Sequence, residues 1–128
     1  MAFNILIVDD SPIMRQVIKK TVRISGIDIG EIYEAGDGTE GLQQAKDNWT
    51  DLILTDINMP QMDGLTFIRE LREDEVLSSI PIIVISTEGR DEIVQKAISL
   101  GAADYITKPF KPEEIGRDVL RVLGYENR

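Results

Sequence analysis

The stretch ILIVDD at Ile5–Asp10 decides the fold, because it is an unbroken apolar run that ends on two acids. Two later stretches repeat the pattern: LILTD at Leu52–Asp56 and IIVIS at Ile82–Ser86. Strands of a parallel sheet are buried on both faces and therefore read as continuous apolar runs. We therefore predict three buried parallel strands, each followed directly by a polar side chain.

The acids after these strands form a candidate site. Carboxyl ends of parallel strands meet at one edge of a sheet, which is where open α/β sheets bind ligands. Asp9, Asp10 and Asp56 should therefore lie close together, and three carboxylates tolerate this only beside a cation. A hard divalent metal together with Lys108, which precedes Pro109, is the simplest combination.

Composition excludes several classes of function. The net charge of −9 argues against nucleic acid or an anionic membrane as the main partner. The absence of cysteine and histidine excludes disulfides, thiolate chemistry and histidine metal sites. No basic leader precedes the first strand, and every apolar run is too short to span a bilayer, so we expect a cytoplasmic protein without membrane insertion.

Strand-like and helix-like segments alternate through a chain long enough for one domain, 1–128. The predicted strands are 3–8, 29–34, 51–55, 81–85 and 103–106. A helix follows each strand, beginning after Ser11-Pro12, at Asp37–Glu40, after Gly64, at Asp91 and at Pro112. This order predicts an α/β fold, a doubly wound five-stranded parallel sheet with helices on both faces.

Local signals support the helices. Ser11 is a good N-cap with proline at the first helical position. Asp37 and Glu40 have the spacing of a capping box. Apolar residues on the first helix recur at helical spacing and predict its buried face: Ile13, Met14, Val17, Ile18, Thr21 and Val22. We expect Trp49 to be a half-buried loop aromatic.

The acidic cluster suggests a definite chemistry. Mg²⁺ is usually bound by one or two carboxylates and several waters, so Asp10 and Asp56 with the main-chain carbonyl of Asn58 would suffice. A carboxylate beside such a metal can act as a nucleophile toward a phosphoryl group, whose charge Lys108 and a Ser86 hydroxyl could neutralise. The alternative is that these acids cap helices or are solvated in loops.

Together these motifs closely resemble the receiver domain of two-component response regulators. The resemblance rests on Ile5–Asp10, Leu54–Pro60 with Met62–Gly64, Ile83–Ser86 and Tyr105–Phe110, in order and across the whole chain. Among receivers, the chain looks most like the single-domain chemotaxis members. The resemblance implies a flavodoxin-like (βα)5 sheet in the order 2-1-3-4-5.

The resemblance also implies roles. Asp56 would accept a phosphoryl group from a sensor histidine kinase or a phosphotransfer domain. Asp10, Asp56 and the Asn58 carbonyl would ligate Mg²⁺, or Mn²⁺, with Asp9 acting mainly through water. Lys108 would contact the phosphoryl oxygens, across a cis bond to Pro109.

The same family pattern implies a switch. The Ser86 hydroxyl would move toward the phosphoryl group, and Tyr105 would rotate inward, changing the face formed by helix four, strand five and helix five. The alternative for Tyr105 is a plain sheet-edge aromatic. Asn58 and Glu88 would tune hydrolysis of the phosphoryl group; Glu88 could also cap helix four, where an acid favours the helix dipole.

The resulting expectation is a stand-alone, monomeric receiver without an output domain, controlling a partner in chemotaxis or at the flagellar motor. The acids Asp91, Glu114 and Asp118 set the helix-four to helix-five region apart from well-known motor-binding members. A phosphate sink or a phosphorelay intermediate is the alternative. A Mg²⁺-dependent phosphatase is disfavoured because Asp9 and Asp10 are adjacent, and we expect no enzyme beyond self-directed phosphorylation and dephosphorylation. A flavin-type phosphate cradle is disfavoured by the acids at the end of strand one.

Overall fold

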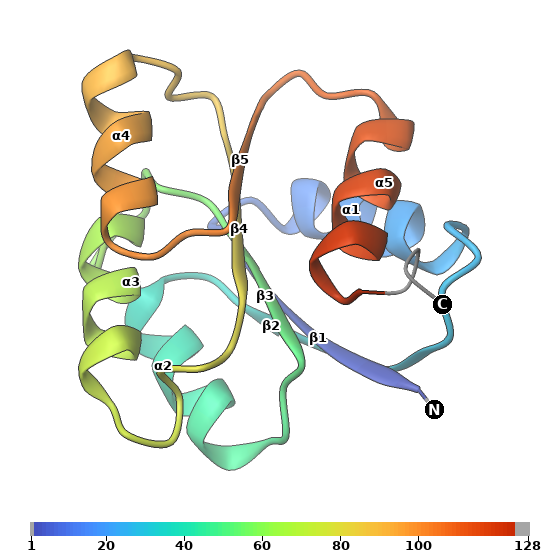
Figure 1. The fold of residues 1–128 in the computed structure, drawn as a ribbon, viewed down its shortest axis with the longest axis horizontal. Coiled ribbons are helices and arrows are strands. Elements are labelled where there is room, and N and C mark those ends of the chain that lie inside the picture. Colours follow the sequence, from blue (N-terminus) through green and yellow to red (C-terminus); the bar gives the residue numbers. More distant parts are fainter. Residues whose placement is uncertain (1, 125–128) are drawn as a thin grey trace.

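The computed structural model describes residues 2–124, which form a five-stranded parallel sheet in the order β2-β1-β3-β4-β5 (Figure 1). The strands are β1 (Phe3–Val8), β2 (Ile29–Ala35), β3 (Leu52–Thr55), β4 (Ile82–Ser86) and β5 (Asp104–Thr107). The helices are α1 (Pro12–Arg23), α2 (Gly38–Asp47), α3 (Gly64–Glu73), α4 (Asp91–Ser99) and α5 (Pro112–Val122). The predicted fold class, strand number and order are confirmed; residues 1 and 125–128 of the expected domain lie outside the described residues.

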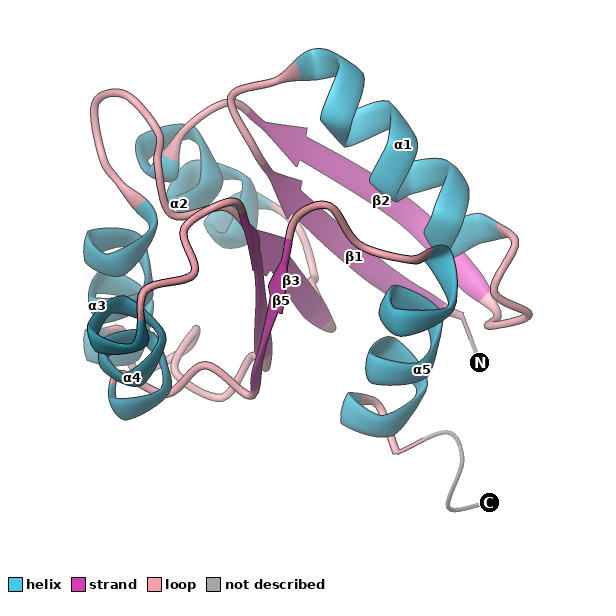
Figure 2. Ribbon diagram, turned by 90° about the horizontal axis from the view of Figure 1, so that it is seen from above, coloured by secondary structure: helices cyan, strands magenta, loops and turns pink. Residues whose placement is uncertain are grey.

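Helices cover both faces of the sheet. Figures 1 and 2 show α1 and α5 on one face and α2, α3 and α4 on the other. Successive side chains of a strand point to opposite faces, so β1 contributes to two cores. Ile5 and Ile7 pack with the α1–α5 layer, whereas Leu6 and Val8 pack with the layer that contains Phe67. This two-sided burial is why the strands read as unbroken apolar runs.

Two of the predicted helix starts have the expected caps. The Ser11 hydroxyl accepts a hydrogen bond from the Met14 amide at 3.1 Å, and the Asp37 carboxylate accepts one from the Glu40 amide at 2.9 Å. The Glu40 carboxylate accepts from the Gly36 amide at 2.8 Å, one residue earlier than a capping box requires. The helix therefore begins where predicted, with a modified cap.

The predicted buried face of α1 is partly wrong. Ile18, Thr21 and Val22 are buried, but Ile13 is 78 % exposed and Val17 is 44 % exposed. Six apolar positions cover more of a helix circumference than one sheet face can bury, so periodicity alone could not tell which would stay outside.

Strand β4 extends one residue further at its carboxyl end than predicted and includes Ser86.

Register brings the site residues together. Val8 pairs with Thr55 across β1 and β3, so Asp9 and Asp56 follow their strands at the same level of the sheet. The start of α3 closes onto this edge, where the Gly64 amide donates to the Ile57 carbonyl at 2.8 Å. A Cβ at Gly64 would lie 2.2 Å from the Asp56 carbonyl oxygen, so only glycine permits this approach.

None of the helices among residues 2–124 is both long enough and apolar enough to cross a bilayer.

Candidate functional site

Three carboxylates gather at the carboxyl edge of the sheet. Asp9, Asp10 and Asp56 each place an oxygen within 4.8 Å of the others. Asp9 and Asp56 are buried, at 1 % and 7 % exposed, whereas Asp10 faces solvent. The predicted cluster is therefore present, with two carboxylates buried in the protein and one exposed at its surface.

Main-chain amides hold the two buried carboxylates. Asp9 Oδ1 accepts from the Ser11 amide at 2.9 Å, and Asp56 Oδ1 accepts from the Ile57 amide at 2.6 Å. Each bond occupies one oxygen and leaves Oδ2 directed toward the shared space. The site is therefore preorganised for cations.

Lys108 supplies one cation. Its Nζ donates to Asp9 Oδ2 at 2.8 Å and to Asp56 Oδ2 at 3.0 Å, and its side chain is only 9 % exposed. Burial lowers the pKa of Lys108, but the two carboxylate hydrogen bonds outweigh it and raise the pKa above its ordinary value. The ammonium is therefore charged throughout the physiological range.

The backbone after β5 positions Lys108. Its amide donates to the Ser86 carbonyl at 2.7 Å, which ties this segment to the end of β4. The Lys108–Pro109 peptide bond is cis, as the resemblance implied.

The donor set fits a hard divalent cation. The cluster offers carboxylate oxygens, without sulfur or imidazole, which suits Mg²⁺ or Mn²⁺. Asp10 makes no hydrogen bond or ion pair with any residue in the described part of the chain, and its exposure leaves it accessible to an arriving ion. Asn58 lies two residues after Asp56 in the chain, and the Asn58 side chain is exposed.

Ser86, Glu88 and Tyr105 form a second group beside the cluster. Ser86 is fully buried, and its hydroxyl accepts from the Glu88 amide at 3.1 Å. The Tyr105 hydroxyl donates to the Glu88 carbonyl. Burial raises the pKa of Tyr105, a Ser86 hydrogen bond lowers it, and the charges of Glu88 and Asp56 raise it, with a net increase. Tyr105 therefore remains a protonated donor, half-buried against the β4–α4 loop.

Glu88 is paired with Arg90 rather than placed as a simple helix cap. Its carboxylate accepts from Arg90 Nε at 2.9 Å, from the second guanidinium nitrogen at 3.0 Å and from the Arg90 amide at 3.2 Å. These hydrogen bonds lower the pKa of Glu88. Arg90 occupies the N-cap position of α4, but its side chain makes no capping hydrogen bond to the helix.

Sequence reasoning missed Arg90 and Arg15 as neighbours of the site. Arg15 donates to the Asp9 carbonyl at 2.6 Å and pairs with Glu34 at 3.0 Å. Glu34 also pairs with Lys19, and although burial raises its pKa, the two basic partners lower it overall. The position of Arg15 one turn after the Ser11 cap was the available signal, but which way it turns depends on β2.

The family model for the response regulator receiver domain matches residues 5–120, which include every residue of the site described above. The chain belongs to this family. Chemotaxis protein CheY1 of Helicobacter pylori is 39 % identical over 94 % of this chain and 97 % of its own length. Chemotaxis protein CheY of Bacillus subtilis is 36 % identical over 97 % of this chain and 100 % of its own.

Solved receiver structures share the fold. Vibrio cholerae CheY4 has a TM-score of 0.85 and 34 % identity, covering 95 % of this chain and 99 % of its own. The CheY in the CheX-CheY-BeF3-Mg²⁺ complex from Borrelia burgdorferi has a TM-score of 0.84 and 30 % identity, covering 94 % and 88 %. The predicted resemblance to receivers of the CheY type is confirmed.

Proposed function

We propose that this receiver accepts a phosphoryl group on Asp56 from a phosphohistidine of a sensor kinase or phosphotransfer domain, in a reaction that depends on Mg²⁺. The observation that carries the proposal is the buried Lys108 ammonium, held at 2.8 Å and 3.0 Å between Asp9 and Asp56. A structural ion pair needs one carboxylate for one lysine. Here Lys108 is shared by two carboxylates, and a third carboxylate, Asp10, lies exposed to solvent beside them. The cluster therefore has more negative than positive charge.

The chemistry is one displacement at phosphorus. A carboxylate oxygen of Asp56 forms a bond to phosphorus, the bond from phosphorus to the histidine nitrogen breaks, and the nitrogen keeps the electron pair. Lys108 would contact an oxygen of the transferred group, and Asp9, Asp10, Asp56 and the Asn58 carbonyl would hold the metal. A bound Mg²⁺ would neutralise charge on the phosphoryl oxygens.

The group formed by Ser86, Glu88 and Tyr105 supports a switching role. The Ser86 hydroxyl would turn from the Glu88 amide toward a phosphoryl oxygen and donate to it, since a hydroxyl both donates and accepts. That rotation would break the hydrogen bond to the Glu88 amide, whose own residue accepts a hydrogen bond from Tyr105 at its carbonyl. Phosphorylation would thereby bias the β4–α4 loop and the α4–β5–α5 face, a local charge event acting on a two-state element.

Asn58 and Glu88 are proposed to tune the lifetime of the phosphoryl group. Each lies two residues after a residue of the site. Arg90 neutralises Glu88 and fixes its direction, so the pair, rather than Glu88 alone, would set how a water approaches.

The names of its relatives support a role in chemotaxis, with the receiver acting as a monomer through the α4–β5–α5 face on a protein partner. We propose no enzymatic activity on a separate substrate. That face is acidic: Asp104 and Asp118 share Arg121, at 2.9 Å and 3.4 Å. A phosphate sink or phosphorelay intermediate remains the second candidate, because an acidic face differs from that of motor-binding members.

The test is intact-protein mass after incubation with acetyl phosphate, with Mg²⁺ or with a chelator. The proposal predicts a gain of one phosphoryl group that needs Mg²⁺ and is absent in Asp56→Asn. Asp51→Asn, an acid at the opposite edge of the sheet, is the matched control and should still gain the group. A gain that is independent of Mg²⁺ or persists in Asp56→Asn would refute the proposal.

A further inference from the structure

Two apolar side chains stand exposed at the edge of the sheet opposite the site. Trp49 is 77 % exposed and Val76 is 80 % exposed, so the expectation of a half-buried tryptophan is wrong. Trp49 precedes β3, and Val76 lies in the segment between α3 and β4. Both line one cavity of about 370 Å³. Two exposed apolar side chains beside one cavity form a candidate interaction surface.

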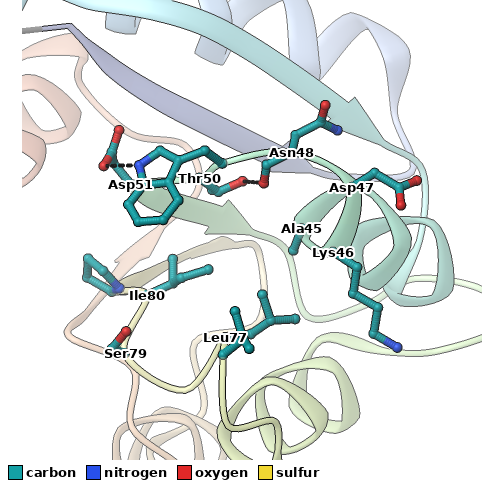
Figure 3. Close-up of a pocket in the computed structure, with 12 residues that line it drawn as sticks. Ala45, Lys46, Asp47, Asn48, Thr50, Asp51, Leu77, Ser79 and Ile80 are labelled. Atoms are coloured by element: carbon teal, nitrogen blue, oxygen red, sulfur yellow. Dashed lines mark hydrogen bonds between the residues drawn. The ribbon is translucent and has the colours of Figure 1, made fainter.

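The floor of this cavity is apolar. Figure 3 shows Ala45, Leu77 and Ile80 gathered around it, from the end of α2 and from the segment before β4. Ala45 and Leu77 are 4 % and 3 % exposed and belong to the core beneath. An aliphatic side chain entering here would contact core residues directly.

Hydrogen bonds brace the wall that carries Trp49. The indole Nε1 donates to Asp51 Oδ1 at 3.0 Å, and Asp51 Oδ2 accepts from the Asn4 amide at 2.8 Å. Asn4 Nδ2 donates to the Trp49 carbonyl at 3.1 Å. Hydrogen bonds at both the indole and the main chain therefore hold Trp49 in place. A rigid exposed aromatic loses little entropy when a partner covers it.

The opposite wall is braced as well. Asp74 Oδ1 accepts from the amides of Val76 and Leu77 at 2.8 Å and 3.0 Å. Arg72 donates to the carbonyls of Ser78 and Ile80 at 2.7 Å and 3.0 Å. Hydrogen bonds therefore hold the backbone of both walls of the cavity.

Charge around the cavity indicates what would bind. Asp47 and Asp51 line it with Lys46, and Asp74 and Glu75 immediately precede Val76. Four acids against two basic residues, Lys46 and Arg72, leave the rim negative and favour a cation there, and a basic side chain can also lie on the indole face. A second copy of this chain is disfavoured, because its net charge of −9 would bring two acidic rims together.

We propose that this cavity docks a segment of a partner protein that carries an aliphatic side chain next to a lysine or arginine. The aliphatic group would fill the space above Leu77, and the basic group would lie between Trp49 and the acidic rim. A protein segment fits better than a small molecule, because Trp49 and Val76 project and need their outer faces covered. The cavity lies at the opposite edge of the sheet from Asp56, so docking and phosphorylation can coexist, and the proposal does not rest on the proposed function.

The test selects short random peptides displayed on phage against the immobilised protein, and against Trp49→Ser and Val76→Ser variants. Ile24→Ser is the control, because Ile24 is 70 % exposed at the end of α1 on the other face. We expect enriched peptides to carry an aliphatic residue beside a basic one. Each cavity variant should weaken binding of the best peptide by roughly tenfold or more, and the control should bind as wild type.

The chain contains a single tryptophan, so its emission reports on the cavity directly. Titration with the best peptide should shift the emission of Trp49 to shorter wavelength as the ring is covered. Equal enrichment on wild type and on the folded cavity variants, or enriched peptides without a basic residue, would overturn the proposal. So would sedimentation showing self-association that Trp49→Ser abolishes, which would identify a second copy as the occupant.

Discussion

Replacing Lys108 by methionine removes the charge at the centre of the site while keeping a long apolar side chain. The substitution leaves Asp9 and Asp56 facing each other without their shared ammonium, at exposures of 2 % and 9 % for their side chains. Breaking a buried ion pair by removing one partner costs about 3–5 kcal/mol. We predict the lower end, about 3 kcal/mol, because water reaches the cluster on the side of Asp10.

The assay is equilibrium unfolding in urea with a chelator present. The matched control is Lys19→Met, which breaks the 3.2 Å pair with Glu34, where the two side chains are 32 % and 27 % exposed. That exposed pair should contribute less than about 1 kcal/mol. In thermal unfolding, the loss for Lys108→Met corresponds to a fall in Tm of roughly 10 °C for a domain of this size.

The pH dependence gives a second check. The folded-state pKa of Lys108 is raised, so its stabilisation is fully present below the unfolded pKa of about 10.4 and is lost only as the pH rises above that value. The difference between wild type and Lys108→Met should therefore be constant across neutral pH. Added Mg²⁺ should stabilise the variant more than wild type, because the ammonium no longer competes for the carboxylates. A loss no larger than that of Lys19→Met would refute the reasoning.

Three further predictions address particular contacts. Gly64→Ala should lower the unfolding free energy by about 3 kcal/mol, because the new Cβ would lie 2.2 Å from the Asp56 carbonyl oxygen. Gly116→Ala is the control and should instead stabilise α5, because its Cβ would meet Ser25 at an ordinary 3.5 Å. Equal effects of the two substitutions on unfolding in urea would contradict the account. Arg90→Ala should shorten the lifetime of the phosphoryl group by roughly twofold or more, because the freed Glu88 carboxylate can accept a proton from the attacking water. The lifetime is measured as the loss of phosphorylated mass over time, and the control Glu92→Ala should not change it. Equal lifetimes in the two variants would show that Arg90 does not have this role. Burial and the neighbouring Asp104 raise the pKa of Asp118 to about 6, so stability from its protonated form is present below about pH 4 and lost as the pH rises to about 6. Asp118→Asn should remove that dependence in urea unfolding and raise stability at pH 7 by about 1 kcal/mol, after allowing for screening at the surface; identical pH profiles would contradict it.

Much of the fold could be read from the sequence, because two-sided burial leaves an unmistakable pattern in the strands. Ile5–Val8 alternates between two cores, and every position must be apolar whichever way it points. Helix α1 offered less information. Both Ile13 and Ile18 fit its apolar stripe, and only the tilt of the helix on the sheet decides that Ile18 is buried and Ile13 exposed.

The candidate site was predictable for a similar reason. Parallel register places the residues after β1 and β3 side by side, so Asp9 and Asp56 had to meet. The pairing of Arg90 with Glu88 depends on the path of a loop, and the exposure of Trp49 depends on hydrogen bonds to Asn4, which is 45 residues away in the chain. Such contacts leave no periodic signal in a single sequence.

The most direct test of the central claim locates the phosphoryl group in the chain. Treatment with acetyl phosphate and Mg²⁺, followed by borohydride, reduces an aspartyl phosphate to homoserine, which peptide mass spectrometry places by residue. The account predicts homoserine at position 56 alone, lost when Mg²⁺ is chelated. Homoserine at position 9 or 10, or none in folded protein, would contradict it.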